Sequence, residues 1–248
     1  MEEKALRLSA VFLMILTAVS FVLLPKLPAL HTWEVEAREE RIAEEEFAQS
    51  QVTMQNLKIK EQNEAAGAKG ELSIRLPEGV TGDQIAVSND YVTQTIRVEI
   101  PQADRTYFDS YPVLGNSDYI DGLSYTRQGE TGVIEVTTNK VYELQTEYDA
   151  QNFYFNFLTP HEVYDKVVVI DAGHGGRAVG ANKQGINEKD IDLAIVLKLK
   201  EIFDNSDQNI GVYYTRTDDS NPTFDQRVQL ANKSDADLFI SIHNNSTR

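Results

Sequence analysis

The 248-residue sequence contains no cysteine, only four histidines and far fewer basic than acidic side chains. The lack of cysteine excludes thiol nucleophiles, disulfide frameworks and every cysteine-ligated zinc or iron–sulfur site. Any bound metal must therefore be held by histidine, aspartate or glutamate. Lysine and arginine number 23 against 39 aspartates and glutamates, so the net charge is −16. We expect no nucleic-acid partner, because phosphate binding depends on lysine and arginine.

One long hydrophobic run is present near the start of the chain. Leu8 to Leu24 is a stretch of 17 residues without a charge, and about 17 residues is the lower limit for crossing a bilayer. No small-residue cleavage site follows it, so an uncleaved anchor is favoured over a cleaved signal peptide. Lys4 and Arg7 precede the run and favour a cytoplasmic N-terminus. We expect residues 1–31 to form a cytoplasmic tip and one transmembrane helix, with the bulk of the chain outside the cytoplasm.

Residues 32–66 are rich in glutamate, alanine, glutamine and arginine and contain no proline. This composition favours helix, and we expect an acidic helical stalk. The apolar positions Val35, Ile42, Phe47 and Met54 form only a broken stripe, which is too irregular to predict a coiled coil. A dimer through the stalk is the less favoured alternative.

From residue 67 to residue 165 the hydrophobic pattern changes to a period of two. Phe153, Phe155 and Phe157 alternate with polar residues, and similar short stretches are separated by turn signals. The segment carries 6 basic and 16 acidic side chains and shows no histidine or carboxylate cluster with catalytic spacing. Short alternating strands between turns are typical of a small β-sandwich or barrel. We therefore predict a β-rich domain over 67–165.

The pattern changes again at Lys166, where the chain becomes nearly neutral, with 10 basic and 12 acidic side chains over 166–248. Residues 167–170 form a β-branched run typical of a strand buried on both faces. A helix is expected after Asn187, with Ile191, Ile195, Leu199 and Ile202 on its apolar face. Further elements are a strand at 211–214, a helix from Thr223 and a strand at 237–242. This order predicts an α/β fold with a parallel sheet.

Three chemically suitable side chains are expected at one edge of that sheet. His174 follows the first strand, His243 follows the third, and Glu188 begins the first helix. Sites in parallel α/β sheets form beyond the carboxyl ends of the strands. Two histidines and one glutamate are a known catalytic zinc set with a fourth position open for water. Each residue alone would more simply be a surface histidine or a helix-terminal acid, but their joint placement favours a metal site.

Several sequence blocks in this segment carry a family resemblance. They are VVIDAGHGG at 168–176, NEKD at 187–190, Thr215-Arg216, Arg227 with 231–232, and SIHNN at 241–245. In order and spacing they closely resemble the zinc-dependent N-acetylmuramoyl-L-alanine amidase family. The resemblance implies that His174, Glu188 and His243 bind zinc (Zn²⁺). It implies a peptidoglycan hydrolase that cleaves the amide between N-acetylmuramic acid and L-alanine. The segment 67–165 resembles the AMIN-type wall-targeting modules often fused to such enzymes.

The resemblance covers 166–248, about a third of the chain, and departs from the family in one respect. The family's general base is a glutamate on a later strand, and its sheet has about six strands, of which three are visible here. We therefore expect an incomplete copy of a longer enzyme, with the base beyond residue 248, and assign no catalytic base in this sequence. Arg216 and Arg227 are interpreted as structural.

Two other functions remain open from the sequence. The chain could be a non-catalytic, membrane-anchored cell-wall-binding protein with an incomplete amidase module. It could also be another zinc peptidase on a related fold, although the glycine-rich histidine loop and the SIHNN block argue against this by resemblance.

Overall fold

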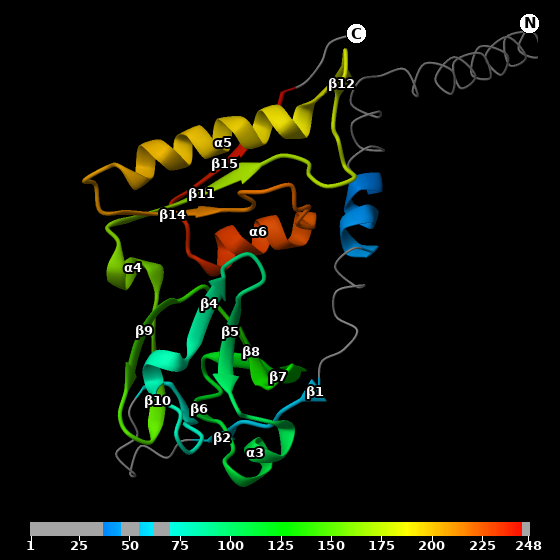
Figure 1. The fold of residues 1–248 in the computed structure, drawn as a ribbon. Helices are drawn as coiled ribbons and strands as arrows, with labels where there is room; N and C mark the ends of the chain where they lie inside the picture. Colours follow the sequence, from blue (N-terminus) through cyan, green and yellow to red (C-terminus); the bar gives the residue numbers. More distant parts are fainter. Residues whose placement is uncertain (1–36, 46–54, 62–69, 245–248) are drawn as a thin grey trace, which may run out of the picture.

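A computed structural model describes residues 37–45, 55–61 and 70–244 of the chain. Figure 1 shows a β-rich domain at the bottom and an α/β module at the top. Among the described residues, no helix is both long and apolar enough to cross a bilayer. The anchor predicted over residues 1–31 lies outside the described residues.

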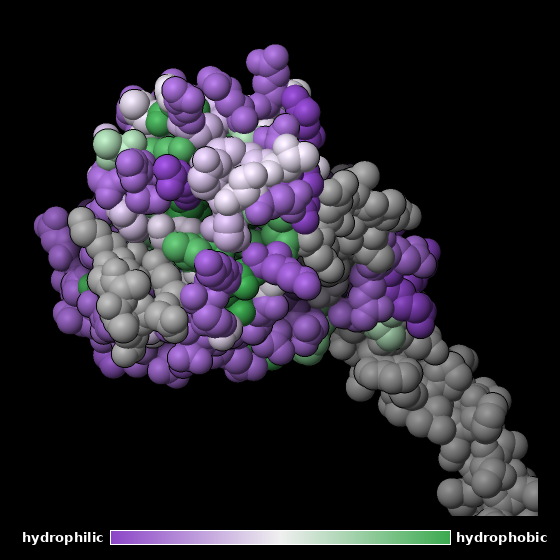
Figure 2. All heavy atoms as spheres, turned by 90° about the horizontal axis from the view of Figure 1, so that it is seen from below, coloured by the Kyte–Doolittle hydropathy of each residue, from purple (hydrophilic) through white to green (hydrophobic). Residues whose placement is uncertain are grey.

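The β-rich domain contains two five-stranded sheets. Their strand orders are β1-β7-β8-β5-β4 and β2-β6-β3-β10-β9. The strands are β1 (Gln55–Asn56), β2 (Lys60–Glu61), β3 (Leu72–Arg75), β4 (Ala86–Asp90), β5 (Thr95–Pro101), β6 (Leu114–Gly115), β7 (Ile120–Gln128), β8 (Thr131–Thr138), β9 (Glu143–Tyr148) and β10 (Asn152–Leu158). A 3-10 turn, η3 (Gly82–Gln84), and a short helix, α3 (Arg105–Ser110), lie between strands. Figure 2 shows the lower face of the molecule, which is mostly hydrophilic with small hydrophobic patches.

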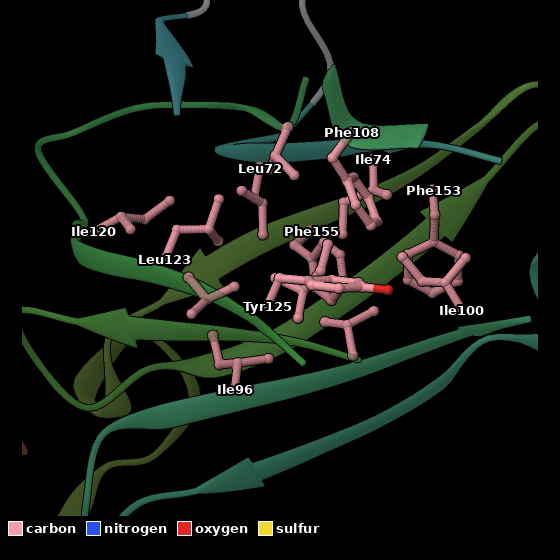
Figure 3. Close-up of a cluster of buried hydrophobic side chains, with 14 of the residues drawn as sticks. Leu72, Ile74, Ile96, Ile100, Phe108, Ile120, Leu123, Tyr125, Phe153 and Phe155 are labelled. Carbon is pink, nitrogen blue, oxygen red and sulfur yellow. The ribbon is translucent and has the colours of Figure 1, made fainter. Parts of the chain in front are cut away.

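The core of this domain takes side chains from both sheets, as Figure 3 shows. The alternation expected from the sequence is observed in β5 and β10, where every second residue is buried. Phe153, Phe155 and Phe157 of β10 are 5%, 0% and 4% exposed. Burying each phenylalanine stabilises the fold by about 1.5–3 kcal/mol. The period of two thus arises because each strand has one face in the core and one outside it.

The helical stalk expected over residues 32–66 is only partly present. The chain is helical over 37–45, but β1 and β2 are extended and pair with β7 and β6. Leu57 and Ile59 pack against the β-rich core, and the Leu57 N–H donates to the Leu123 carbonyl at 2.9 Å. The helix prediction is therefore wrong for 55–61, because pairing with an existing sheet outweighs local helix propensity. The other residues of the predicted stalk lie outside the described ranges.

The α/β module contains a three-stranded parallel sheet in the order β14-β11-β15, as the sequence predicted. Its elements are α4 (Pro160–Val163), β11 (Lys166–Ala172), the hairpin β12 (Asn182–Lys183) and β13 (Ile186–Asn187), α5 (Glu188–Asp204), β14 (Ile210–Tyr214), α6 (Phe224–Lys233) and β15 (Leu238–Ile242). α5 and α6 cover opposite faces of the sheet. Val167 and Val169 of β11 pack with Leu230 of α6, whereas Ile170 packs with Val196 of α5.

The face of α5 that is buried differs from the predicted one. Ile191, Ile195 and Ile202 are 39%, 37% and 65% exposed. The inward face carries Glu188, Asp192 and Val196, and Leu199 and Phe203 continue it against the sheet. These positions are three or four residues apart and therefore lie on one face of the helix. Because Glu188 points inward, the other residues on its face point inward as well. Aliphatic residues surround most of this helix, and hydrophobicity alone could not choose between the faces.

The two parts of the protein share a small hydrophobic core. Val141, Tyr91 and Val92 of the β-rich domain pack with residues of β11, β14 and α6. The Glu143 carboxylate accepts hydrogen bonds from the hydroxyls of Tyr91 and Tyr213, at 3.0 and 2.6 Å. The composition change at Lys166 coincides with the start of β11. The residues before and after this boundary nevertheless pack against each other in the shared core.

Candidate metal centre

The loop after β11 adopts a conformation that places its histidine at the edge of the sheet. His174 has a φ of 60°, and Gly175 and Gly176 have φ values of 141° and 51°. A positive φ is uncommon for a residue with a side chain, so the loop reverses direction within a few residues. A Cβ atom on Gly173 would lie 2.4 Å from the His243 ring. Glycine at 173 therefore leaves the space that the second histidine occupies.

The three predicted ligand residues come together at this edge. The distance from His174 Nε2 to His243 Nδ1 is 3.1 Å, and that from His174 Nε2 to Glu188 Oε1 is 3.2 Å. His243 Nδ1 lies 3.3 Å from Glu188 Oε1. His174 Nε2, His243 Nδ1 and Glu188 Oε1 thus form a nearly equilateral triangle, called the ligand triangle below. The three residues are separated by up to 69 positions in the chain, and the sheet topology brings them to one place.

The size of this triangle can be compared with what a metal ion requires. In tetrahedral zinc sites the ligand atoms lie about 2.0–2.1 Å from the metal, so neighbouring ligand atoms lie about 3.3–3.4 Å apart. The observed separations of 3.1, 3.2 and 3.3 Å are close to this edge length. The residue types and the spacing therefore both fit one tetrahedral ion with a fourth position open.

Glu188 is held as an anion in this arrangement. It is 4% exposed, and burial raises its pKa. The backbone N–H of Ala181 donates to its Oε2 at 2.8 Å, and the backbone N–H of Asn244 donates to its Oε1 at 2.9 Å. Together with the His174 imidazole these donors outweigh burial, and the net pKa of Glu188 is lowered. A buried carboxylate kept in its charged form is the state that metal binding requires.

Asp192 also lies in this cluster and was not singled out from the sequence. One ligand atom from each of Asp192, His174, Glu188 and His243 lies within 4.8 Å of the others. Asp192 is fully buried, its Oδ1 accepts from Asn244 Nδ2 at 2.7 Å, and its Oδ2 has no hydrogen-bond partner among the described residues. Burial raises its pKa. Its position four residues after Glu188 on a helix was the available signal.

Arg216 and Arg227 support the loop with backbone and carboxylate contacts, which agrees with their structural interpretation. Arg216 donates to the carbonyls of Ala172 and Gly173, at 2.9 and 2.7 Å. Arg227 pairs with the Asp171 carboxylate at 2.6 Å and donates to the His174 carbonyl at 2.8 Å. Neither guanidinium is aimed at the ligand triangle in these contacts.

A second residue missed from the sequence comes from the helix over 37–45. Glu39 Oε2 lies 2.8 Å from His174 Nδ1, across 135 positions of the chain. Burial lowers the pKa of His174, but hydrogen bonding and charge attraction from Glu39, with Glu188, outweigh it and raise the net pKa. No local signal in the sequence connects these two residues.

Comparisons with known proteins agree with the resemblance in this segment. Residues 168–248 match the family model described as N-acetylmuramoyl-L-alanine amidase. The chain is 40% identical over 79 residues to the N-acetylmuramoyl-L-alanine amidase CwlM of Bacillus licheniformis, covering 32% of this chain and 31% of that protein. It is 46% identical over 82 residues to an endolysin of Bacillus phage SPP1, covering 33% of this chain and 30% of that protein.

A solved structure is also similar in this region. The catalytic domain of CwlV, an N-acetylmuramoyl-L-alanine amidase from Bacillus (Paenibacillus) polymyxa var. colistinus, is 42% identical, with 33% of this chain and 46% of that chain covered and a TM-score of 0.32. The chain spans about a third of the length of the curated relatives it matches. The C-terminal third of this chain, residues 168–248, is thus similar to the N-acetylmuramoyl-L-alanine amidase family.

Proposed function

We propose that the protein is a zinc-dependent peptidoglycan hydrolase that cleaves the amide between N-acetylmuramic acid and L-alanine. The observation that carries this proposal is the triangle of His174, Glu188 and His243 at the edge of the sheet. The family match over residues 168–248 supports the substrate and the bond. Peptidoglycan is therefore the proposed partner.

Each of the three side chains has a defined part in holding the metal. His174 would offer Nε2, His243 would offer Nδ1 and Glu188 would offer Oε1, since these atoms converge. A bound zinc ion would supply Lewis acidity and lower the pKa of a water molecule to about 7. Two neutral imidazoles and one carboxylate offset only part of the ion's charge. We assign no general base among the described residues.

The hydrophobic run Leu8–Leu24 supports a proposal for the location of the protein. We propose that it anchors the chain in the cell membrane by a single pass, with the described residues outside the cytoplasm. Fourteen residues lie between Leu24 and Glu39, and the fifteen Cα–Cα steps that join them span at most about 50 Å when extended. The metal centre, which Glu39 contacts, would then lie within about 50 Å of the membrane surface. We further propose that the β-rich domain is an AMIN-like wall-binding module. A dimer through the segment 32–66 is the less favoured proposal.

Zinc content and product identity test the proposed activity together. The protein expressed from its complete reading frame and purified in detergent is expected to retain about one zinc ion and to release a new L-alanine amino terminus from muropeptides. Metal analysis and mass spectrometry measure these two outcomes. His174→Ala and His243→Ala should lose both zinc and cleavage. His161→Ala is the matched control, because His161 is exposed and lies near the Asp235 carbonyl rather than the triangle.

The same assay separates the alternatives. A new amino terminus within the peptide stem would identify a zinc peptidase instead. Binding to sacculi without any new amino terminus would support a non-catalytic wall-binding protein. Full cleavage by both histidine variants would refute the proposed centre.

A further inference from the structure

The helix over residues 37–45 is docked against the α/β module by two neighbouring glutamates. Glu39 contacts His174 Nδ1 at 2.8 Å. Glu40 accepts a hydrogen bond from the backbone N–H of Phe224, the first residue of α6. Figure 1 shows this helix beside the loop that leads to β12 and beside the N-terminal end of α6. A segment that precedes the β-rich domain in the chain therefore reaches the metal-centre loop.

The nitrogen that Glu39 contacts decides what this residue can do. His174 Nε2 is the atom that faces His243 and Glu188, at 3.1 and 3.2 Å. Glu39 lies on the opposite nitrogen, Nδ1. It therefore takes no position around the metal and leaves the fourth position open. A carboxylate at Nδ1 accepts the proton of that nitrogen, so the lone pair of the neutral ring is on Nε2.

We propose that Glu39 is a positioning residue for His174: it fixes the tautomer and the ring orientation with which His174 meets the metal. The inference rests on the proposed metal centre. His174 stands between two glycines with a positive φ, so its short loop offers few side chains that could hold the ring. Arg227 holds the His174 carbonyl, which fixes the backbone but not the imidazole. Glu39 supplies the missing contact, and both carboxylate and ring are largely buried at 19% and 10% exposure.

This arrangement makes the metal centre dependent on a segment outside the amidase-like residues. Glu39 lies 129 positions before the start of the matched range 168–248. Carboxylates that orient metal-binding histidines typically change metal affinity by about 10- to 100-fold when removed. We expect a loss of this size when Glu39 is replaced, with the fold of the chain unchanged.

Metal titration of the full chain in detergent tests the proposal. The chain is stripped of metal and titrated with zinc against a chelating indicator, and with cobalt to record visible absorption from the bound ion. Glu39→Ala should bind zinc about 10- to 100-fold more weakly and shift the cobalt spectrum. Glu39→Gln should be intermediate, because its amide oxygen still accepts the Nδ1 proton but carries no charge. Circular dichroism of each metal-free variant checks that it is folded.

Glu44→Ala is the matched control, because Glu44 is an exposed residue of the same helix; it should bind both metals as the unmodified chain does. Unchanged zinc affinity and cobalt spectrum in Glu39→Ala would overturn the proposal. Equally weakened zinc binding in Glu44→Ala would also overturn it, since the helix would then act through its packing. Faster muropeptide cleavage by Glu39→Ala would overturn it as well, since the helix would then block the site. An unmodified chain that binds no zinc would instead refute the proposed metal centre, and this inference with it.

Discussion

Removing the Arg227 guanidinium should strongly destabilise the α/β module. Arg227 and Asp171 are 8% and 3% exposed and pair at 2.6 Å. Among the residues that the structure describes, Arg227→Ala leaves the Asp171 carboxylate with only the hydroxyls of Thr215 and Ser241 as side-chain hydrogen-bond donors. Removing one partner of a buried ion pair costs about 3–5 kcal/mol. For a chain of this size that corresponds to a fall in Tm of roughly 6–20 °C.

The same substitution should also change how the stability of the fold depends on pH. Burial raises the pKa of Asp171, but Arg227 and the hydroxyl donors outweigh it and lower the net pKa. In the unmodified chain this group stabilises the fold above its unfolded pKa of about 3.9, and the contribution is lost as the pH falls through the lower folded value. In Arg227→Ala burial dominates and the folded pKa rises. The variant should then lose stability as the pH rises above about 4, opposite to the unmodified chain.

Thermal and urea unfolding between pH 4 and pH 8, followed by circular dichroism, measure both effects. Arg105→Ala is the control, because its pair with Asp109 is exposed and such pairs contribute only about 0.3–0.5 kcal/mol. The double variant Asp171→Asn, Arg227→Met should recover part of the loss, since neither partner is then left charged and alone. A loss in Arg227→Ala no larger than that in Arg105→Ala would refute the reasoning.

Two further substitutions probe the site itself. Gly173→Ala should weaken zinc binding at least 10-fold, because the new Cβ would lie 2.4 Å from the His243 ring; zinc titration measures this, and wild-type affinity would contradict it. Gly122→Ala is the control, as its Cβ would meet only ordinary contacts at 3.7 Å. Asp192→Asn should raise the Tm of the metal-free chain at pH 7, by about 2–4 °C per kcal/mol of burial cost removed. Burial raises the pKa of Asp192, so this gain should vanish below about pH 4. An equal or lower Tm at pH 7 would refute it.

The sequence predicts the α/β module well because its signals are local. A β-branched run forms β11, and the helix predicted from Thr223 is observed as α6, with Thr223 as its N-cap in a capping box with Gln226. Parallel strands must meet at one edge, so three distant residues could be placed together without any contact information.

The parts that were missed depend on contacts between distant segments. Leu57 and Ile59 lie in a helix-favouring composition, yet they form no helix: they lie between β1 and β2 and pack against the β-rich core. The inward face of α5 is set by Glu188 and Asp192 at the site rather than by its isoleucines. Glu39 belongs to a charged helix in which any of several glutamates could have been the one that meets His174.

These same long-range contacts imply that the amidase-like segment is not an independent unit. Tyr91 and Val141 of the β-rich domain cover the face of the sheet that carries Val167 and Val169. Excision of residues 166–248 would uncover only the side of those fully buried valines that the β-rich domain covers, because Leu230 of α6 would still pack against them. The cost for each valine is therefore below the roughly 1.5–3 kcal/mol of full exposure. The excision would also remove Glu39 from His174. The β-rich domain therefore stabilises one face of the sheet while the helix over 37–45 orients a ligand at its edge, and the metal centre depends on both.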